Sequence, residues 1–352
     1  ETGTMTEIIE TYLSQNTFDR AVIVRKNPIA VGKIFSRIQD AVDAATDGDT
    51  IQVLSGTYEG IVNINKPLSL VGVKENSPII LGGFVINTSG VVSIENMNFK
   101  VPTGTPVDGI SITKVETLSV EHSNFDGSDL FLTGKRGIMS NYSQSNVTVG
   151  NSNFSNGYYI AIQGKYNELN ISNTTISNCK SGINFQSGND LTVTDTNISV
   201  VAKGNTNDTY AVRFASESAN TGKDMILNGG KYVVDKKGFT ADPGIYHSAI
   251  IVRSGASGVL KANNLSLGGE VVNLSGQKLD ATKNWWGDLD PSDNIKNSGT
   301  GSIDYSPWWG EDYANDDHSS AWTWYTNDSI QEAVNVATSR DIVNVTAGTY
   351  YG

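Results

Sequence analysis

The 352-residue sequence contains a single cysteine, three histidines and no run of eighteen apolar residues. One cysteine cannot form an intramolecular disulfide, so packing must stabilise the fold, and we interpret Cys179 as a small buried apolar residue. The missing apolar run argues against a membrane-spanning helix, and no signal peptide is visible. We therefore interpret the chain as a soluble, mature or truncated piece, in which Glu1-Thr2-Gly3 resembles a remnant of a secretion vector.

Charged residues are also scarce, at 18% of the chain, and acidic residues outnumber basic ones to give a formal net charge of −12. Nucleic acids and anionic membranes attract clustered lysine and arginine, so this balance argues against either as the main partner. The chain is instead rich in Asn, Ser, Thr and Gly, with 36 glycines, and its Val, Ile and Leu residues occur in short groups. This composition predicts a many-stranded all-β protein.

A short segment with alternating apolar positions recurs along the chain. Clear copies occupy residues 92–99, 118–125, 147–154, 169–176 and 191–198, and weaker copies lie near 260–267 and 279–286. Successive clear copies start 26, 29, 22 and 22 residues apart, which fits one solenoid turn with loops of variable length. A second class of strand opens with small residues, as in residues 109–112 and 182–185, so we expect two or three strands in each coil.

These segments resemble the coil repeats of right-handed parallel β-helix proteins, the superfamily that includes pectate lyases and many bacterial and archaeal surface proteins. The resemblance covers roughly residues 36–307 and implies an all-β, right-handed parallel β-helix solenoid with an N-terminal capping helix. An amphipathic segment fits the cap, with an apolar face of Ile38, Ala41, Val42 and Ala45. Stacked coils place like residues above like, so we expect Asn-rich corners with hydrogen-bonded ladders, one position of which is His122.

The C-terminal end of the sequence repeats the start of the predicted solenoid. Residues 330–352 align without a gap on residues 38–60, and twelve of the 23 positions are identical. Two tryptophan motifs, at 284–287 and 305–310, are similar to the endings of β-helix units in large surface proteins, where clustered Trp side chains would cover the open end of the core. We predict four regions: an N-terminal segment (1–35), a parallel β-helix (36–310), an acidic linker that contains tryptophan (311–328) and the start of a second unit (329–352).

Enzymes of this fold often degrade acidic polysaccharides, so catalysis needs a direct test. A lyase requires several carboxylates for calcium beside an Arg or Lys base. The candidate bases are Arg136, Lys180, Arg213 and Arg253, whereas the carboxylates are scattered along the sequence, at Asp126, Asp129, Asp190, Asp195 and Asp208. The Asn-Thr-Asp, Gly-His-Gly and Arg-Ile-Lys motifs of the fold's hydrolases are absent. We therefore predict no catalytic residues and no enzyme activity.

The pattern favours a structural or adhesive cell-surface module, such as an S-layer-like component, a fibre or an adhesin, built from tandem β-helix units outside the cell. Its expected partners are further copies of itself or cell-surface glycans. The alternative is a polysaccharide-binding module, or a lyase that acts on acidic glycans. Binding would be favoured if four tyrosines line one face, although corner packing is the simpler role for them: Tyr142, Tyr158, Tyr159 and Tyr166.

Three further sets of residues are predicted sites. Two acidic clusters offer alternating oxygen donors for Ca²⁺, the only expected cofactor, with solvated loop acids as the alternative: Asp288, Asp290 and Asp293, then Asp312, Asp316 and Asp317. Twelve Asn-X-Ser/Thr sequons predict an exported glycoprotein: Asn87, Asn141, Asn146, Asn153, Asn170, Asn173, Asn197, Asn207, Asn264, Asn273, Asn327 and Asn344. The C-terminal repeat needs a surface to pack on, either its own last coil or a neighbouring molecule, through Ile330, Ala333, Val334, Ala337, Ile342 and Val345.

Overall fold

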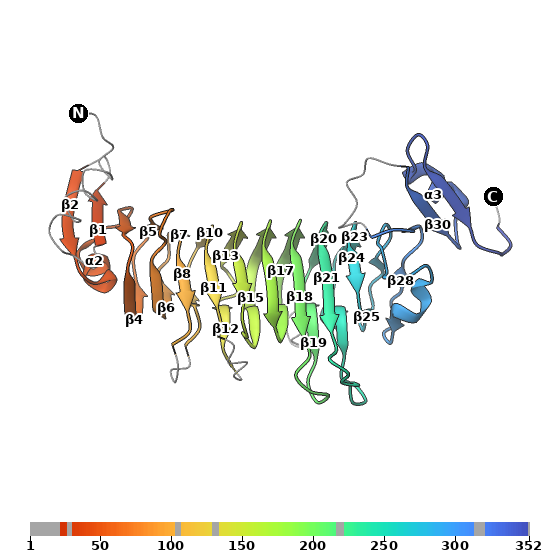
Figure 1. Cartoon of the computed structure of the whole chain (residues 1–352), viewed down its shortest axis with the longest axis horizontal. Coiled ribbons are helices and arrows are strands. Elements are labelled where there is room, and N and C mark those ends of the chain that lie inside the picture. The colour runs from red at the N-terminus through yellow and green to blue at the C-terminus, as the bar shows by residue number, and fades with distance from the viewer. Residues whose placement is uncertain are drawn as a thin grey trace.

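The computed structural model describes residues 22–26, 30–102, 107–128, 134–215, 222–312 and 321–350. These residues form an elongated solenoid with a short helix at one end and a small separate sheet at the other (Figure 1). Parallel strand pairing continues from β3 (Thr50–Val53) to β28 (Ile303–Asp304), which confirms the predicted parallel β-helix. No helix in the described ranges is both long enough and apolar enough to span a membrane.

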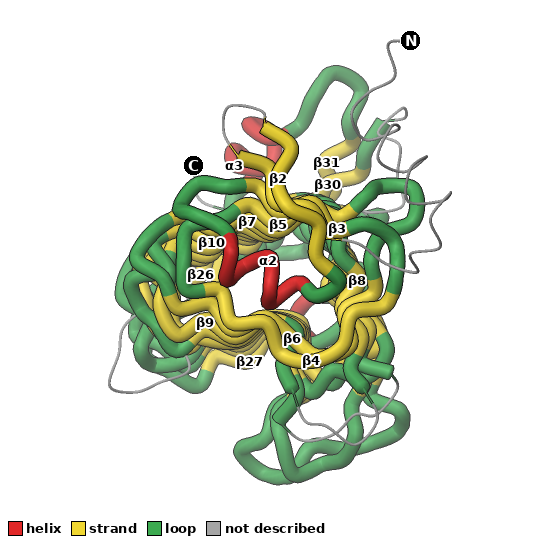
Figure 2. Tube along the Cα trace, turned by 90° about the vertical axis from the view of Figure 1, so that its left-hand side faces the viewer, coloured by secondary structure: helices red, strands yellow, loops and turns green. Residues whose placement is uncertain are grey.

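Each coil contributes to three parallel sheets that enclose the core, as the end-on view in Figure 2 shows. Sheet 1 contains β3, β5 (Ser69–Gly72), β7 (Val91–Glu95), β10 (Thr117–Glu121), β13 (Asn146–Gly150), the C-terminal parts of β15 (Ile160–Ser172) and β17 (Ser181–Thr194), β20 (Asp224–Asn228), β23 (Leu260–Asn263), β26 (Leu279–Asp280) and β28. Sheet 2 contains the N-terminal parts of β4 (Thr57–Ile64) and β6 (Ile79–Asn87), β8 (Asn98–Lys100), β11 (Asn124–Asp126), β14 (Asn153–Ser155), β16 (Thr175–Cys179), β18 (Asn197–Val201), β21 (Lys231–Asp235) and β24 (Ser266–Gly268).

Sheet 3 forms the remaining side of the solenoid. It contains the C-terminal parts of β4 and β6, β9 (Ile110–Lys114), β12 (Arg136–Ser140), the N-terminal parts of β15 and β17, β19 (Thr209–Phe214), β22 (His247–Val252), β25 (Glu270–Asn273) and β27 (Ile295–Asn297). This sheet arises from the predicted strand class that opens with small residues.

The core consists of apolar residues stacked in register from coil to coil. In sheet 3, Ile138 pairs with Ile162, and both are fully buried. In sheet 2, the ring of Phe125 lies between those of Phe99 and Phe154, with centroid distances of 4.7 and 4.4 Å. Because side chains alternate across a strand, the alternating apolar positions of the sequence all face this interior.

The corner between sheets 1 and 2 explains the recurrent asparagines. A residue in the left-handed backbone conformation occupies this corner in most coils, with φ between 45° and 60°: Asn96, His122, Asn151, Asn173, Asp195, Asn264 and Lys283. Asn and Asp tolerate positive φ better than other residues with a Cβ atom. Asparagine ladders occur at and beside this corner, where Asn264 Nδ2 donates to Asn228 Oδ1 and Asn124 Nδ2 donates to Asn98 Oδ1, both at 2.7 Å. His122 lies at the expected corner position.

The N-terminal end is closed by α2 (Ile38–Ala44), which buries Ile38, Ala41 and Val42. Two strands precede it, β1 (Val22–Lys26) and β2 (Ala30–Phe35), and β1 pairs antiparallel with both β2 and β3. The sheet therefore begins inside the predicted N-terminal segment, as an antiparallel extension that the repeat pattern did not predict.

The C-terminal end is closed by tryptophans, as predicted. Trp286 and Trp308 are buried in the main core, and the ring of Tyr305 lies 6.4 and 5.8 Å from theirs. A 3₁₀ turn, η1 (Pro291–Asn294), lies between them in the chain. Beyond them, β29 (Trp308–Trp309) pairs antiparallel with β30 (Thr323–Thr326), which pairs parallel with β31 (Ile342–Val345), and α3 (Ile330–Val336) connects these last two strands.

Candidate functional site

The outer face of sheet 3 carries a row of polar side chains in register. Gln163 on β15 pairs with Asn184 on β17, which pairs with Arg213 on β19. Gln163 and Asn184 are only 8% and 1% exposed, although they point away from the apolar core. Burial of amide side chains is costly unless they are hydrogen-bonded, and both of them bind arginine.

Two arginines are oriented by these amides. Arg136 donates from Nε to Gln163 Oε1 at 3.1 Å, and its backbone N–H donates to Asp108 Oδ1 at 2.9 Å. Arg213 donates from Nε to Asn184 Oδ1 at 3.2 Å. Each guanidinium therefore has one edge fixed by its neighbouring coil, and about a quarter of each side chain is exposed to solvent.

The carboxylate of Asp208 links a third arginine, Arg253, to Arg213. This carboxylate accepts from Arg213 Nη1 at 3.1 Å, from Arg253 Nη2, and from the backbone N–H of Tyr246 at 3.0 Å. The Asp208 side chain is only 8% exposed, so it acts mainly to hold two guanidiniums side by side. The resulting pair is more rigid than surface arginines with free rotamers.

Tyrosine rings pack against three of the cations. The guanidinium carbon of Arg213 lies 4.5 Å from the Tyr210 ring centroid, and that of Arg253 lies 5.6 Å from the Tyr246 centroid. Lys180 Nζ lies 4.3 Å from the centroid of Tyr159 and donates to its hydroxyl at 3.2 Å. Such cation–π contacts hold a positive charge in place without neutralising it.

The cationic face, defined here as Arg136, Lys180, Arg213 and Arg253, differs in charge from the rest of the chain. Its four cations face two carboxylates, Asp108 and Asp208, so the local formal charge is +2 on a chain of net charge −12. Burial raises the pKa of Asp108 despite the opposing effect of Arg136. From β12 to β22 the face spans four strand spacings, or about 19 Å.

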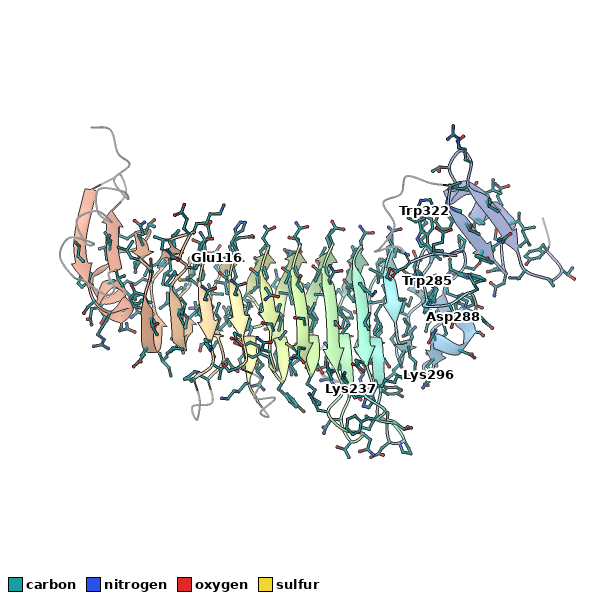
Figure 3. All side chains as sticks on the ribbon, in the orientation of Figure 1. Glu116, Lys237, Trp285, Asp288, Lys296 and Trp322 are labelled. Carbon is teal, nitrogen blue, oxygen red and sulfur yellow. The ribbon has the colours of Figure 1, made fainter. Side chains whose placement is uncertain are left out.

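A cavity of about 370 Å³ adjoins the cationic face under the loop 236–246. His247 lines it, is 2% exposed, and has neither ring nitrogen hydrogen-bonded to any described residue. Lys236 and Lys296 also line it, and both ammonium groups contact Glu270, at 3.5 and 2.9 Å. Figure 3 shows Lys296 near the projecting loop that carries Lys237. Because two ammonium groups and a carboxylate line the cavity, it fits a polar ligand.

The four tyrosines proposed from the sequence do not line one face. Tyr158 and Tyr166 are fully buried in the main core, where burial raises the pKa of both hydroxyls, and Tyr142 packs against that core. Tyr159 alone reaches the cationic face, through Lys180. The residues that complete the face were not singled out from the sequence: Asp108, Gln163, Asn184, Tyr210, Tyr246 and His247.

The predicted calcium ligands have other contacts. Asp290 caps η1 by accepting from the N–H and hydroxyl of Ser292, and these bonds lower the pKa of Asp290. Asp312 accepts from Ser266 and lies 3.6 Å from Lys231 Nζ. Within the described ranges no three His, Cys, Asp or Glu side chains are grouped to hold a metal ion, so Asp288, Asp290, Asp293 and Asp312 do not converge. Asp316 and Asp317, like Asp129, lie outside the described residues.

Eleven of the twelve sequon asparagines are exposed or half-buried. Asn273 is the exception, because it is fully buried and its amide donates to the carbonyls of Gln277 and Ser302. A glycan cannot be attached to that nitrogen in the folded chain, so the prediction for Asn273 is corrected. Cys179 is buried as expected, and burial raises the pKa of its thiol to about 12.

The predicted assembly residues divide into two groups. Ala333 is fully buried, and Ala337 packs with Val336 and Val343 against a cluster of Trp309, Trp322 and Trp324. These two residues therefore pack on the C-terminal end of their own chain, which is one of the two predicted alternatives. The other members are 40–54% exposed: Ile330, Val334, Ile342 and Val345.

The fold and the site together define a parallel β-helix protein with a cationic outer face. No family model matches the chain, and no curated protein matches it. Among solved structures, an arginine-to-alanine mutant of the PL6 family alginate lyase AlyGC aligns over 88% of this chain with 11% sequence identity and a TM-score of 0.31. The chain spans 63% of the length of that protein.

Proposed function

We propose that this chain is an extracellular binding module that holds an anionic polysaccharide along the outer face of sheet 3. The observation that carries the proposal is the set of three partly exposed guanidiniums on the coils that contain β12, β19 and β22, fixed by buried amides, Asp208 and tyrosine rings. Lys180, just before β17, is 8% exposed. Carboxylate and sulfate groups of a glycan accept paired hydrogen bonds from guanidinium edges. A repeating polyanion can contact several of these cations at once.

The cavity at His247 supports the same class of ligand. Thr240 and Asp242 also line it, and a hydroxyl and a carboxylate can form hydrogen bonds with sugar hydroxyls. Lys236 and Lys296 add positive charge at the cavity wall, where Glu270 offsets part of it. A glycan that crosses the cationic face would therefore meet both charged and hydroxyl-binding groups.

This proposal gives the adhesive form of a cell-surface module a physical basis. Adhesion through glycans needs a rigid scaffold that presents a binding face, and stacked coils provide such a scaffold. An S-layer-like or fibre role, the extracellular location, calcium binding and occupied sequons remain proposals from the sequence.

A lyase is the second candidate, and one observation favours it. The Tyr159 hydroxyl lies 3.2 Å from Lys180 Nζ on the same face as the arginines. A phenol beside a cation is a possible proton donor or acceptor next to groups that would stabilise an enolate. Binding without turnover is the primary proposal.

The test measures the affinity of the full chain for alginate, polygalacturonate and chondroitin sulfate, with dextran as the neutral polymer. Binding should weaken as salt rises, because ions screen the exposed cations. Arg213→Met removes one guanidinium and should weaken binding about ten- to hundredfold, the range expected for a charged hydrogen bond.

Lys278→Met is the matched control, since it removes the same charge outside the cationic face, in the turn before β26 of sheet 1, where Lys278 pairs with Asp304 at 2.7 Å. It should change affinity by less than about twofold. Equal effects of the two substitutions, or equal binding of dextran, would refute the cationic face as the binding site. Release of unsaturated uronate, followed by its absorbance and lost in Tyr159→Phe, would establish the lyase instead.

A further inference from the structure

The C-terminal segment 329–350 is folded in the same way as the N-terminal cap that it repeats. In the first copy, Asp49 Oδ2 accepts from the N–H and hydroxyl of Thr46 at 2.8 and 2.9 Å. In the second copy, Asp341 Oδ2 accepts from the same two groups of Thr338 at 2.8 and 3.1 Å. The tyrosine bonds also match, because Tyr58 donates to the carbonyl four residues before it and Tyr350 does the same.

The helix and the strand after it are alike in the two copies, but their neighbouring strand differs, because β1 pairs antiparallel with β3 whereas β30 pairs parallel with β31. The two copies also differ in burial. Val42 is fully buried, whereas Val334, 292 positions later, is 51% exposed. Ile38 is 2% exposed against 40% for its counterpart Ile330. The strand that follows shows the same contrast, because Val53 on β3 is fully buried and Val345 on β31 is 42% exposed.

In the first copy, strands β1 and β2 contact α2, and the coil that follows in the chain covers it as well. Strand β5 pairs in parallel with β3, and Gln39 on α2 exchanges two hydrogen bonds with the backbone of Asn63 on β4. Lys66 then donates to three carbonyls at the end of α2, those of Val42, Asp43 and Ala45. This coil therefore covers α2, pairs with the edge of β3 and caps the C-terminal end of α2.

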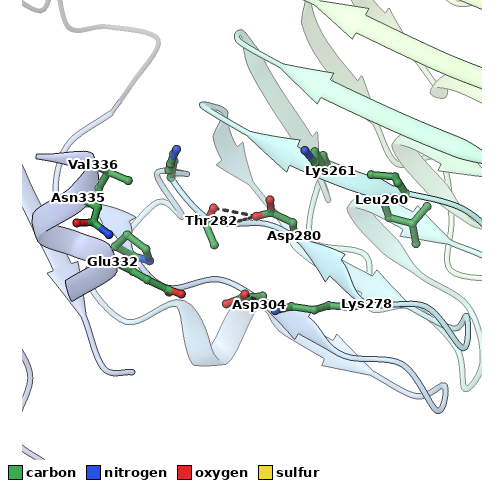
Figure 4. A pocket seen from close by; sticks show the side chains of 12 residues that line it. Leu260, Lys261, Lys278, Asp280, Thr282, Asp304, Glu332, Asn335 and Val336 are labelled. Carbon is green, nitrogen blue, oxygen red and sulfur yellow. Dashed lines mark hydrogen bonds and ion pairs between the residues drawn. The ribbon is translucent and has the colours of Figure 1, made fainter. Parts of the chain in front are cut away.

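The second copy has the same groups without that coil. Gln331 donates to Asn335 at 2.8 Å, as Gln39 does to Asp43, but no described residue occupies the place of Asn63 or Lys66. On the other side, α3 already faces its own chain, where Glu332, Asn335 and Val336 line a cavity of about 530 Å³ with the last coils (Figure 4). The exposed side of α3 and β31 is thus separate from the side that docks on the solenoid.

We propose that Ile330, Val334, Ile342 and Val345 form the docking surface for the first coil of a following β-helix unit, of the same design as residues 57–72. Its strand would pair in parallel with the free edge of β31, as β5 pairs with β3. Its backbone would bond Gln331, and a lysine at its turn would cap α3, as Lys66 caps α2. The cap of one unit would thereby be held on the tryptophan end of the unit before it, which would join β-helix units into a rigid tandem array. This inference is independent of glycan binding.

The test extends the full chain so that residues 61–310 follow Gly352, in register with the internal repeat. A thiol is placed on the docking surface by Val334→Cys, and Cys179 gives no background because it is fully buried. Labelling by a maleimide should be at least about tenfold slower in the extended chain than in the 352-residue chain. Val42→Cys is the matched control, since the equivalent position should be protected in both chains.

A second extension of equal length, made of Gly and Ser, is the control for the effect of an unfolded tail on the labelling rate. Hydrogen exchange of the Ile342–Val345 amides provides an independent measurement and should be slowed only by the β-helix extension. Equal labelling and equal exchange in the two extended chains would overturn the proposal. Protection of Val334→Cys that rises with the concentration of the unextended chain would also overturn it, because the occupant would then be a second copy.

Discussion

Replacing Phe125 with alanine removes the central ring of the stack that runs through sheet 2. The ring is fully buried, and it lies parallel to those of Phe99 and Phe154, with interplanar angles of 8° and 3°. Loss of a buried phenylalanine costs about 3–5 kcal/mol in the free energy of unfolding. The two ring pairs account for about 1–3 kcal/mol of that loss.

The location of the destabilised strands is as informative as the loss in the free energy of unfolding. In a solenoid each coil contacts only its neighbours, so the destabilisation should be local. We expect faster amide exchange in β8, β11 and β14, with β22 and β25 unchanged. Urea unfolding gives the magnitude, and hydrogen exchange measured by mass spectrometry gives the location.

Phe239→Ala serves as the control, because that ring is 41% exposed on the loop 236–246. It should change the free energy of unfolding by no more than about 0.5 kcal/mol. A similar loss from both substitutions would mean that the stacked rings are not the core. Faster exchange spread evenly over all strands would mean that the coils do not act as neighbouring units.

Three further predictions follow from buried polar and ionisable groups. Cys179 should resist thiol reagents at pH 8 and react fully in denaturant, and rapid labelling of the native chain would contradict its burial. Burial raises the pKa of Asp108 in the folded chain above its value in the unfolded chain. Above the folded-state pKa, the buried carboxylate is ionised and lowers the free energy of unfolding, whereas below the unfolded-state pKa it is protonated in both states and has no such effect. Asp108→Asn should therefore gain stability relative to the original chain between pH 3 and pH 7 in urea unfolding, and a relative loss would show that the bond from the Arg136 backbone dominates. Glycopeptide mapping of secreted chain should find Asn273 unoccupied, whereas any glycan there would contradict its buried hydrogen bonds.

The sequence predicted those parts of the fold that repeat along the chain. Alternating apolar positions indicated the inward faces, and the recurrent Asn positions indicated corners that require a positive φ, including the corner at His122. The tryptophan motifs indicated how the C-terminal end is closed. Strand β1 was not predicted, because it pairs antiparallel with β3 and belongs to no repeat.

The cationic face could not be found from spacing along the chain. Arg136, Arg213 and Arg253 are far apart in sequence and lie on one side of the solenoid only through the register of sheet 3, while Asp208, which precedes β19, links Arg213 to Arg253. The net charge of −12 gave no indication of the local excess of positive charge on the cationic face. An alignment of the small-residue strands on one another would have placed Gln163, Asn184 and Arg213 in one column.

The location of a bound glycan tests the proposed function most directly. A crystal structure of the full chain with an acidic oligosaccharide, such as a tetramer of uronic acid, would show where the sugar lies. We predict a carboxylate of the sugar within hydrogen-bonding distance of the Arg213 or Arg253 guanidinium, with neighbouring hydroxyls directed toward the His247 cavity. An oligosaccharide bound only at the tryptophan end, or on sheet 1 or sheet 2, would contradict the proposal.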